Sequence, residues 1–302
     1  MTRYLACALF AGALLFIGVD PALGQLAVDP VTADPPADAQ HPARLVSFSF
    51  TSGGETVLGR ALIAQGQGPH PTVLLLHGMP GLELNLDVAQ AFRRAGWNVF
   101  MLHYRGSWGS GGDFSFKSVV EDTSTAVDVL HASPSSNPAW RVDAERIVLV
   151  GHSVGGFAAL TVTAAHPKVK AVASMAGFDV GAQGVIMASN PEARERWLRV
   201  FQGTRALKVP DPEKLLTQWA SSAPEIRFVK LDAPLSSKPV LLVAGSKDTI
   251  APPAEHHQPL AKALRAKEGG KFTEVVLDAD HSFSDKRIAL TRAVLAWLEQ
   301  QK

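Results

Sequence analysis

A serine between glycines is the residue of this sequence best suited to covalent chemistry. Residues 151–155 read Gly-His-Ser-Val-Gly, a G-x-S-x-G pattern that follows an apolar run. Such a serine sits on a sharp turn between a strand and a helix, and the flanking glycines avoid the clashes that Cβ atoms would cause. We therefore expect Ser153 to be the nucleophile of an acyl transfer. The alternative is a glycine-rich turn that carries an incidental serine.

A serine hydroxyl is a poor nucleophile unless a base lies next to it, and histidine is the usual base. His281 lies just beyond the last apolar run, in the stretch 277–283. Loops that follow parallel strands meet at one edge of the sheet, the edge where Ser153 is expected. His281 is therefore the candidate base, and the alternative is a histidine that only caps the last strand.

The other histidines near apolar runs are weaker candidates. His152 is too close to Ser153 in sequence to turn its ring productively toward that hydroxyl. His77 and His103 close apolar runs and are expected to pack or hydrogen-bond near the site. The pair 256–257 is expected to lie on the solvated surface, and it lacks other ligands at the spacing that a metal site requires.

A carboxylate must hold the base in the correct tautomer and stabilise its protonated form. Asp248 follows the apolar run 238–246 and is the candidate, with Asp179 in reserve. Asp278 and Asp280 are close to the base in sequence and are expected to shape its turn. The resulting chain order is serine, aspartate, histidine.

Two backbone amides must point at the developing oxyanion. The amide of Val154, directly after the nucleophile, is the first candidate. The second comes from residues 77–81, His-Gly-Met-Pro-Gly, where Met79 is preferred because Pro80 has no N–H to donate.

Apolar runs alternate with segments of helical spacing over most of the chain. This alternation predicts an α/β fold, with a mostly parallel central sheet and helices on both faces. A hairpin at 44–64 precedes it. The expected strands are 71–78, 97–104, 146–153, 169–177, 238–246 and 271–278, and the expected helices are 84–95, 117–131, 154–166, 254–268 and 285–300.

The stretch 178–237 separates two expected strands and has a helical pattern. Its length favours a helical cap inserted over the sheet edge, although an elongated crossover would read similarly. Residues 44–302, including this cap, are therefore expected to form one domain.

The N-terminus reads as a targeting segment. Residues 1–24 combine Arg3, an apolar run at 5–19 and small residues before Gln25, which predicts a cleaved signal peptide. The apolar run is short for a membrane-spanning helix, which is the alternative. Residues 25–43 are rich in Pro, Ala and Asp and are expected to form a flexible leader. The protein is thus expected to be exported, periplasmic or secreted, with no stable membrane insertion.

Composition excludes several classes of protein. The formal net charge is +1, from 29 Lys and Arg against 28 Asp and Glu, so nothing indicates a nucleic-acid partner. Cys7 is the only cysteine and lies in the expected signal peptide. The mature chain would have no disulfide, no cysteine nucleophile and no cysteine-based zinc site.

Three pieces of the sequence together resemble the α/β-hydrolase superfamily: the HG-x-P-G stretch at 77–81, the GHS-x-GG stretch at 151–156, and the late pair Asp248 and His281. The resemblance covers residues 44–300. It implies hydrolysis of an ester, thioester, amide or peptide bond, usually without a cofactor. Residues 104–112 are similar to an Arg-Gly loop that supports the oxyanion turn in many members. The first stretch looks like that of proline iminopeptidases, and this loop looks more like that of dipeptidyl-peptidase-type hydrolases.

Three functions remain open on this basis. The first is an esterase for small or medium carboxylic esters, because Trp197, Phe201 and Trp219 could line an acyl pocket, although they could equally pack the cap to the core. The second is an aminopeptidase or dipeptidyl peptidase, which would bind a free ammonium group. The third is a non-catalytic binding module. The substrate would be a small ester or a short peptide.

The peptidase hypothesis depends on carboxylates in the cap. Glu192, Glu195 and Glu213 could bind the ammonium group, but their spacing is also typical of a solvated helix face. The sequence does not indicate an oligomeric state.

Overall fold

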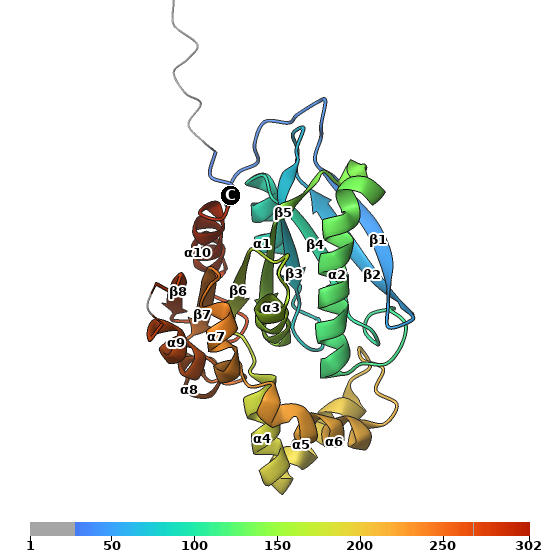
Figure 1. The fold of residues 1–302 in the computed structure, drawn as a ribbon, viewed down its shortest axis with the longest axis vertical. Helices are drawn as coiled ribbons and strands as arrows, with labels where there is room; N and C mark the ends of the chain where they lie inside the picture. Colours follow the sequence, from blue (N-terminus) through green and yellow to red (C-terminus); the bar gives the residue numbers. More distant parts are fainter. Residues whose placement is uncertain (1–27, 268) are drawn as a thin grey trace, which may run out of the picture.

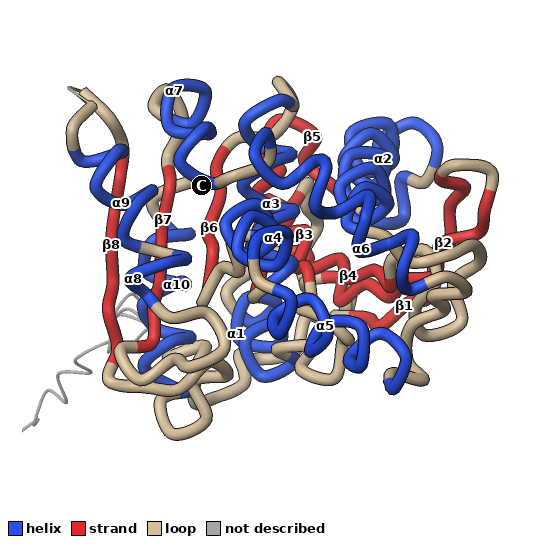
Figure 2. The backbone as a smooth tube through the Cα atoms, turned by 90° about the horizontal axis from the view of Figure 1, so that it is seen from below, coloured by secondary structure: helices blue, strands red, loops and turns tan. Residues whose placement is uncertain are grey.

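The fold is built on a single eight-stranded sheet. The computed structural model describes residues 28–267 and 269–302, and within these residues the strand order is β1-β2-β4-β3-β5-β6-β7-β8. Figure 2 shows β8, β7 and β6 at one side of the molecule and β4, β2 and β1 toward the other. The strands are β1 (Arg44–Ser52), β2 (Glu55–Ile63), β3 (His70–Leu76), β4 (Asn98–His103), β5 (Val142–His152), β6 (Ala171–Met175), β7 (Val240–Gly245) and β8 (Phe272–Leu277).

Most of the sheet is parallel, as the sequence predicts. β1 and β2 form an antiparallel hairpin, β2 pairs antiparallel with β4, and every other neighbouring pair is parallel. Parallel neighbours need crossover connections, and helices supply them here. The α/β-hydrolase type of fold is therefore confirmed.

Helices cover both faces of the sheet (Figure 1). Successive strand residues point to opposite faces, so Leu74 and Leu149 join one buried cluster while Val73 and Val148 join the other. On the first face lie α2 (Phe116–Ser136), α3 (Val154–Ala165) and α9 (Gln258–Arg265), and on the second lie α1 (Leu86–Arg94) and α10 (Arg287–Glu299). Burial on both faces explains the continuous apolar runs of the central strands.

Between β6 and β7 the chain forms a series of helices, and the first three of them lie together at one end of the molecule (Figure 1). Asn190 and Asp211 cap the second and third of them, each followed by a proline at the first helical position. The elements are α4 (Val180–Ser189), α5 (Pro191–Gly203), α6 (Pro212–Ser222), α7 (Asp232–Leu235) and two 3₁₀ turns, Ala223–Glu225 and Phe228–Leu231. We call this group the cap.

Aromatic side chains join the cap to the rest of the domain. Trp219 and Phe201 are buried, and the Trp219 ring lies 4.7 Å from Phe116 at the start of α2. Trp219 also donates a hydrogen bond from Nε1 to the Val180 carbonyl. Of the two roles considered for Trp219 and Phe201, the structure favours packing of the cap to the core.

One expected helix is divided in two. The sequence predicts a helix over 254–268, but the structure has α8 (Pro253–His256) and then α9 from Gln258. Pro259 explains the break, because a proline has no N–H and clashes with the carbonyl four residues earlier. A further 3₁₀ turn, Pro138–Trp140, precedes β5.

The stretch 28–43 contains no helix or strand but contacts the domain. Asp29 pairs with Arg292 at 2.9 Å, and Arg94 donates to the Pro30 carbonyl. Val31 packs against the second buried cluster. This stretch, expected to be a flexible leader, is thus attached to α1 and α10 at these points. The expected signal peptide lies outside the described residues. Within them, no helix has both the length and the hydrophobicity to cross a membrane.

Candidate active site

Ser153 lies on a strained turn between β5 and α3. Its φ is 56° and its ψ is −121°, a region that residues other than glycine rarely occupy. A Cβ on Gly151 would overlap the carbonyl of Gly155, and a Cβ on Gly155 would overlap the carbonyl of Leu76. Both flanking positions therefore require glycine. Strain of this kind persists where the surrounding structure enforces it, and it is concentrated at functional sites.

His281 and Asp248 come together at the same edge of the sheet. His281 Nδ1 lies 2.7 Å from Asp248 Oδ2, and Asp248 Oδ1 accepts the amides of Ile250 and Ala251 at 2.8 Å each. Burial alone would raise the pKa of Asp248, but these hydrogen bonds outweigh it and leave the pKa lowered. The ionised carboxylate only accepts, so Nδ1 carries the proton and Nε2 remains free to act as a base.

Ser153 is 6% exposed, in contact with the turn that follows β3. An ideal Cβ on Gly78 would lie 2.8 Å from the Ser153 Cβ. No hydrogen bond joins the Ser153 hydroxyl to His281 in the described chain, and such bonds commonly tighten only when substrate binds. The structure thus brings His281 and Asp248 into contact, with Ser153 on the same edge.

The two candidate oxyanion donors are unoccupied. Within the described residues, neither the Met79 amide nor the Val154 amide donates to a protein acceptor. Val154 is the first residue of α3, where amides have no partner within the helix and form the positive end of its dipole. Free donors on both sides of Ser153 fit an oxyanion hole.

The loop after β4 supports the turn that contains Met79. Tyr104 donates its hydroxyl to the His77 carbonyl at 3.1 Å, and Trp108 donates Nε1 to the Pro80 carbonyl at 2.7 Å. This is the support that the resemblance implied for residues 104–112.

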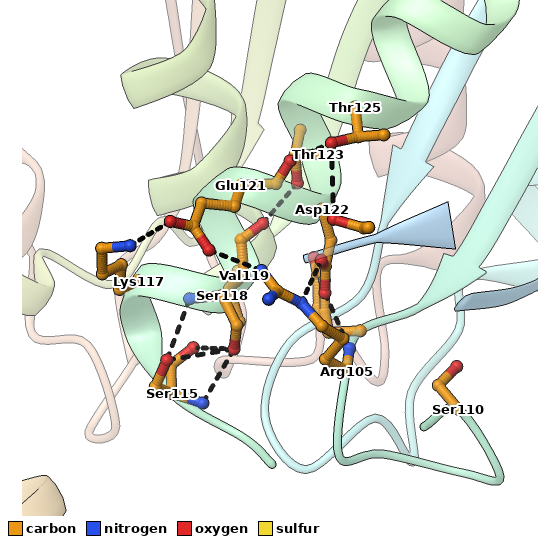
Figure 3. A network of polar contacts seen from close by, with 12 residues as sticks. Arg105, Ser110, Ser115, Lys117, Ser118, Val119, Glu121, Asp122, Thr123 and Thr125 are labelled. Carbon is orange, nitrogen blue, oxygen red and sulfur yellow. Dashed lines mark hydrogen bonds and ion pairs between the residues drawn. The ribbon is translucent and has the colours of Figure 1, made fainter. Parts of the chain in front are cut away.

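A polar network fixes that loop to α2 (Figure 3). Arg105 donates its backbone amide and its Nε to the carboxylate of Asp122, at 2.7 and 2.6 Å. Asp122 is fully buried, and Arg105 also pairs with Glu121 at 2.6 Å. Glu121 is in turn paired with Lys117. Sequence reasoning identified the loop but not this anchor, because the partner lies seventeen residues away on a helix.

Asp179, the reserve acid, has a different set of contacts. Its carboxylate accepts the amides of Ala182 and Phe228, so it caps α4 and holds the cap. Burial raises its pKa despite these bonds. No hydrogen bond links it to His281 within the described chain.

The expectation that residues 256–257 lie on the solvated surface is wrong. His256 is 2% exposed, stacks on Phe178 with ring centroids 4.6 Å apart, and accepts the Asp179 amide at Nδ1. His257 is 8% exposed and lies 2.7 Å from Glu274. His256 is thus buried against the loop after β6 and His257 lies against β8, and the neighbouring sequence gives no sign of either contact.

Three buried histidines surround the site. Burial is the main cause that lowers the pKa of each from 6.5 to about 4, so their rings are neutral near neutral pH. They are His77, His152 and His256. No group of three or more His, Cys, Asp or Glu residues in the described chain is arranged to hold a metal ion.

The fold defines the chain as an α/β hydrolase. The sequence profile of the Prolyl oligopeptidase family, Peptidase_S9, matches residues 84–302. The chain belongs to this family, and the match makes it a hydrolase of the peptidase S9 type.

The chain is also similar to individual proteins and solved structures. Protein bem46 of Schizosaccharomyces pombe is 27% identical over 205 residues, which cover 67% of this chain and 60% of that protein. An esterase of Pyrococcus furiosus superposes with a TM-score of 0.59 at 16% identity, covering 85% of this chain and 93% of its own. An acylaminoacyl peptidase of Pyrococcus horikoshii gives 0.63 at 16% identity, covering 85% and 41%. At such low identity the two structures establish the fold alone.

Proposed function

We propose that the protein is a serine esterase that cleaves carboxylic esters through an acyl-enzyme. The observation that carries the proposal is the 2.7 Å contact of His281 with Asp248 at the edge that holds the strained Ser153. Ser153 attacks the ester carbonyl while His281 Nε2 accepts its proton, and the amides of Met79 and Val154 stabilise the oxyanion.

The second half of the reaction uses the same groups. His281 returns the proton to the leaving alcohol, which leaves the acyl group on Ser153. Water then attacks the acyl-enzyme with His281 again as the base, and the carboxylic acid is released. Asp248 stays ionised throughout and stabilises the imidazolium.

The cap supports an ester rather than a peptide with a free amino terminus. Glu213 pairs with Arg194 at 2.6 Å and Glu195 pairs with Arg199 at 2.8 Å, and both glutamates are exposed. Glu192 is also exposed. Carboxylates already paired with arginine in solvent are poorly suited to bind a substrate ammonium group in the site.

Apolar side chains on the loops of the site support an apolar substrate. Leu82, Trp108 and Ile250 are 73, 44 and 60% exposed. They lie in the loops after β3, β4 and β7, and the first and third of these loops also contain Met79 and Asp248. Exposed apolar groups on loops at the carboxyl edge of the sheet favour binding of an acyl or alkyl group.

The test compares substrates directly. Hydrolysis of p-nitrophenyl esters of graded chain length is measured beside aminoacyl- and dipeptidyl-p-nitroanilides, with Ser153→Ala as control. We expect ester turnover that is lost in the variant. Anilide turnover that requires a free amino terminus would replace the esterase proposal with a peptidase, the activity that the family name suggests. Turnover that survives in Ser153→Ala would refute the nucleophile.

We also propose that the protein is exported. The support is the sequence of residues 1–24. Mass spectrometry of the protein from its native host tests this: a mature N-terminus near Gln25 is expected, and an intact N-terminus in the cytoplasm would refute export.

A further inference from the structure

His152 precedes the nucleophile, yet its side chain contacts the loop that carries the base. His152 Nε2 lies 2.9 Å from the backbone carbonyl oxygen of His281, and the two ring centroids are 4.9 Å apart. A carbonyl oxygen only accepts hydrogen bonds, so Nε2 must carry a proton and donate it. We call the turn between β5 and α3, which holds His152 and Ser153, the elbow. A direct hydrogen bond therefore joins the elbow to the loop of His281, 129 residues later in the sequence.

We propose that His152 is a positioning residue, which sets the place of the His281 imidazole relative to Ser153 by holding the His281 backbone. The inference rests on the proposed function, since it concerns the same base and nucleophile. Because His152 and Ser153 are adjacent, any shift of the elbow is passed to the base through one hydrogen bond. Catalysis is sensitive to displacements of about 1 Å between reacting groups.

The residues that follow His281 in its loop are held by contacts other than the one with His152. Arg287 donates Nη1 to the Ser282 carbonyl at 2.8 Å, and Phe283 is fully buried with a φ of 54°. These contacts fix the next two residues of the loop to α10 and to the core. Only the His152 contact joins the carbonyl of His281 itself to the elbow, among the hydrogen bonds of the described chain.

The protonation state of His152 suits this position. Burial, followed by the charge of His281, lowers the pKa of His152 to about 4, so its ring is neutral when the enzyme works. The charged or titratable groups that act on it are His281, Arg287 and Asp248. A neutral donor holds the loop without placing a second positive charge beside His281 when that ring is protonated during turnover.

The test removes the donor and then restores it. His152→Phe keeps a buried ring without a donor, whereas His152→Gln keeps an N–H within similar reach of the carbonyl. The matched control is His70→Phe, because His70 is also buried and its Nε2 lies 3.1 Å from the Gly66 carbonyl, far from the site on the opening residue of β3. The readouts are the rate of Ser153 phosphonylation by a fluorophosphonate, kcat and KM for a p-nitrophenyl ester, and the melting temperature.

We expect His152→Phe to lower the phosphonylation rate and kcat by about tenfold, the equivalent of one lost hydrogen bond, with KM little changed. His152→Gln should recover most of the rate, and His70→Phe should retain it. A rate in His152→Phe within twofold of the parent's, or an equal loss in His70→Phe, would overturn the inference. Absence of labelling in the parent protein would instead refute the proposed function.

A second measurement needs no variant. ¹⁵N NMR of the histidine rings reports which nitrogen carries the proton. A neutral His152 ring with its proton on Nε2 is expected across the active pH range. A proton on Nδ1 alone would overturn the inference even if His152→Phe fails to fold.

Discussion

The role of Asp248 can be tested by a change of one atom, Asp248→Asn. The asparagine oxygen can take the place of Oδ1 and still accept the amides of Ile250 and Ala251, so the local turn should be preserved. The asparagine NH₂ then faces His281 Nδ1 in place of Oδ2. It can only donate, so Nδ1 must become the acceptor and the ring proton moves to Nε2. The nitrogen that faces the nucleophile is then unable to accept a proton.

The magnitude follows from the loss of the base. In a serine hydrolase the wrong tautomer lowers kcat by about 10⁴-fold, which corresponds to about 5.5 kcal/mol of barrier. Stability should change far less, because two of the three hydrogen bonds to this side chain are kept.

The assay is kcat for a p-nitrophenyl ester together with the melting temperature. Asp278→Asn is the matched control, since Asp278 is exposed and pairs with Lys247 at 2.8 Å, a contact of small energetic value. We expect near-normal turnover in the control. If Asp248→Asn loses less than about tenfold, while the control behaves as expected, the assignment of Asp248 as the orienting acid is refuted.

Two further predictions concern stability. Arg105→Met should lower the free energy of unfolding by about 3 kcal/mol, because it leaves the Asp122 carboxylate buried without its cation. This value is at the low end for a broken buried pair, since Arg105 is partly exposed. Urea unfolding measures the change, and a loss below about 0.5 kcal/mol would refute the prediction. Three buried histidines stay neutral in the folded protein between pH 6.5 and about 4, whereas the same residues bind protons in the unfolded chain. The free energy of unfolding should therefore fall as the pH drops through this window, by up to about 1.4 kcal/mol per pH unit for each ring. Thermal melts across pH 4–7 check this, and a flat profile would contradict it. The rings concerned are His77, His152 and His256.

The sheet could be predicted because buried parallel strands have a recognisable sequence. Short continuous apolar runs such as the one before Gly151 are typical of strands that are covered on both faces of a sheet. Since strand ends meet at one edge, the positions of Ser153, Asp248 and His281 in sequence were enough to expect them together. The hydrogen bond between Asp248 and His281 agrees with that expectation, while their catalytic roles stay predictions.

Contacts made across loops could not be predicted in the same way. The sequence predicts a surface position for His256 because its own short helix has no apolar face, whereas its partner Phe178 lies in the loop after β6. The closeness of His152 to Ser153 in sequence excludes it as the base, but its contact with the His281 backbone depends on the fold of both segments. The attachment of Val31 likewise depends on tertiary packing rather than local composition.

The most direct test of Ser153 as the nucleophile is to find the residue that a serine-hydrolase inhibitor modifies covalently. The protein is treated with a fluorophosphonate, digested, and mapped by mass spectrometry, with Ser153→Ala and His281→Gln treated in parallel. We expect a single adduct on Ser153, formed much more slowly in His281→Gln and absent in Ser153→Ala. An adduct on another residue, or equal labelling of all three proteins, would contradict it.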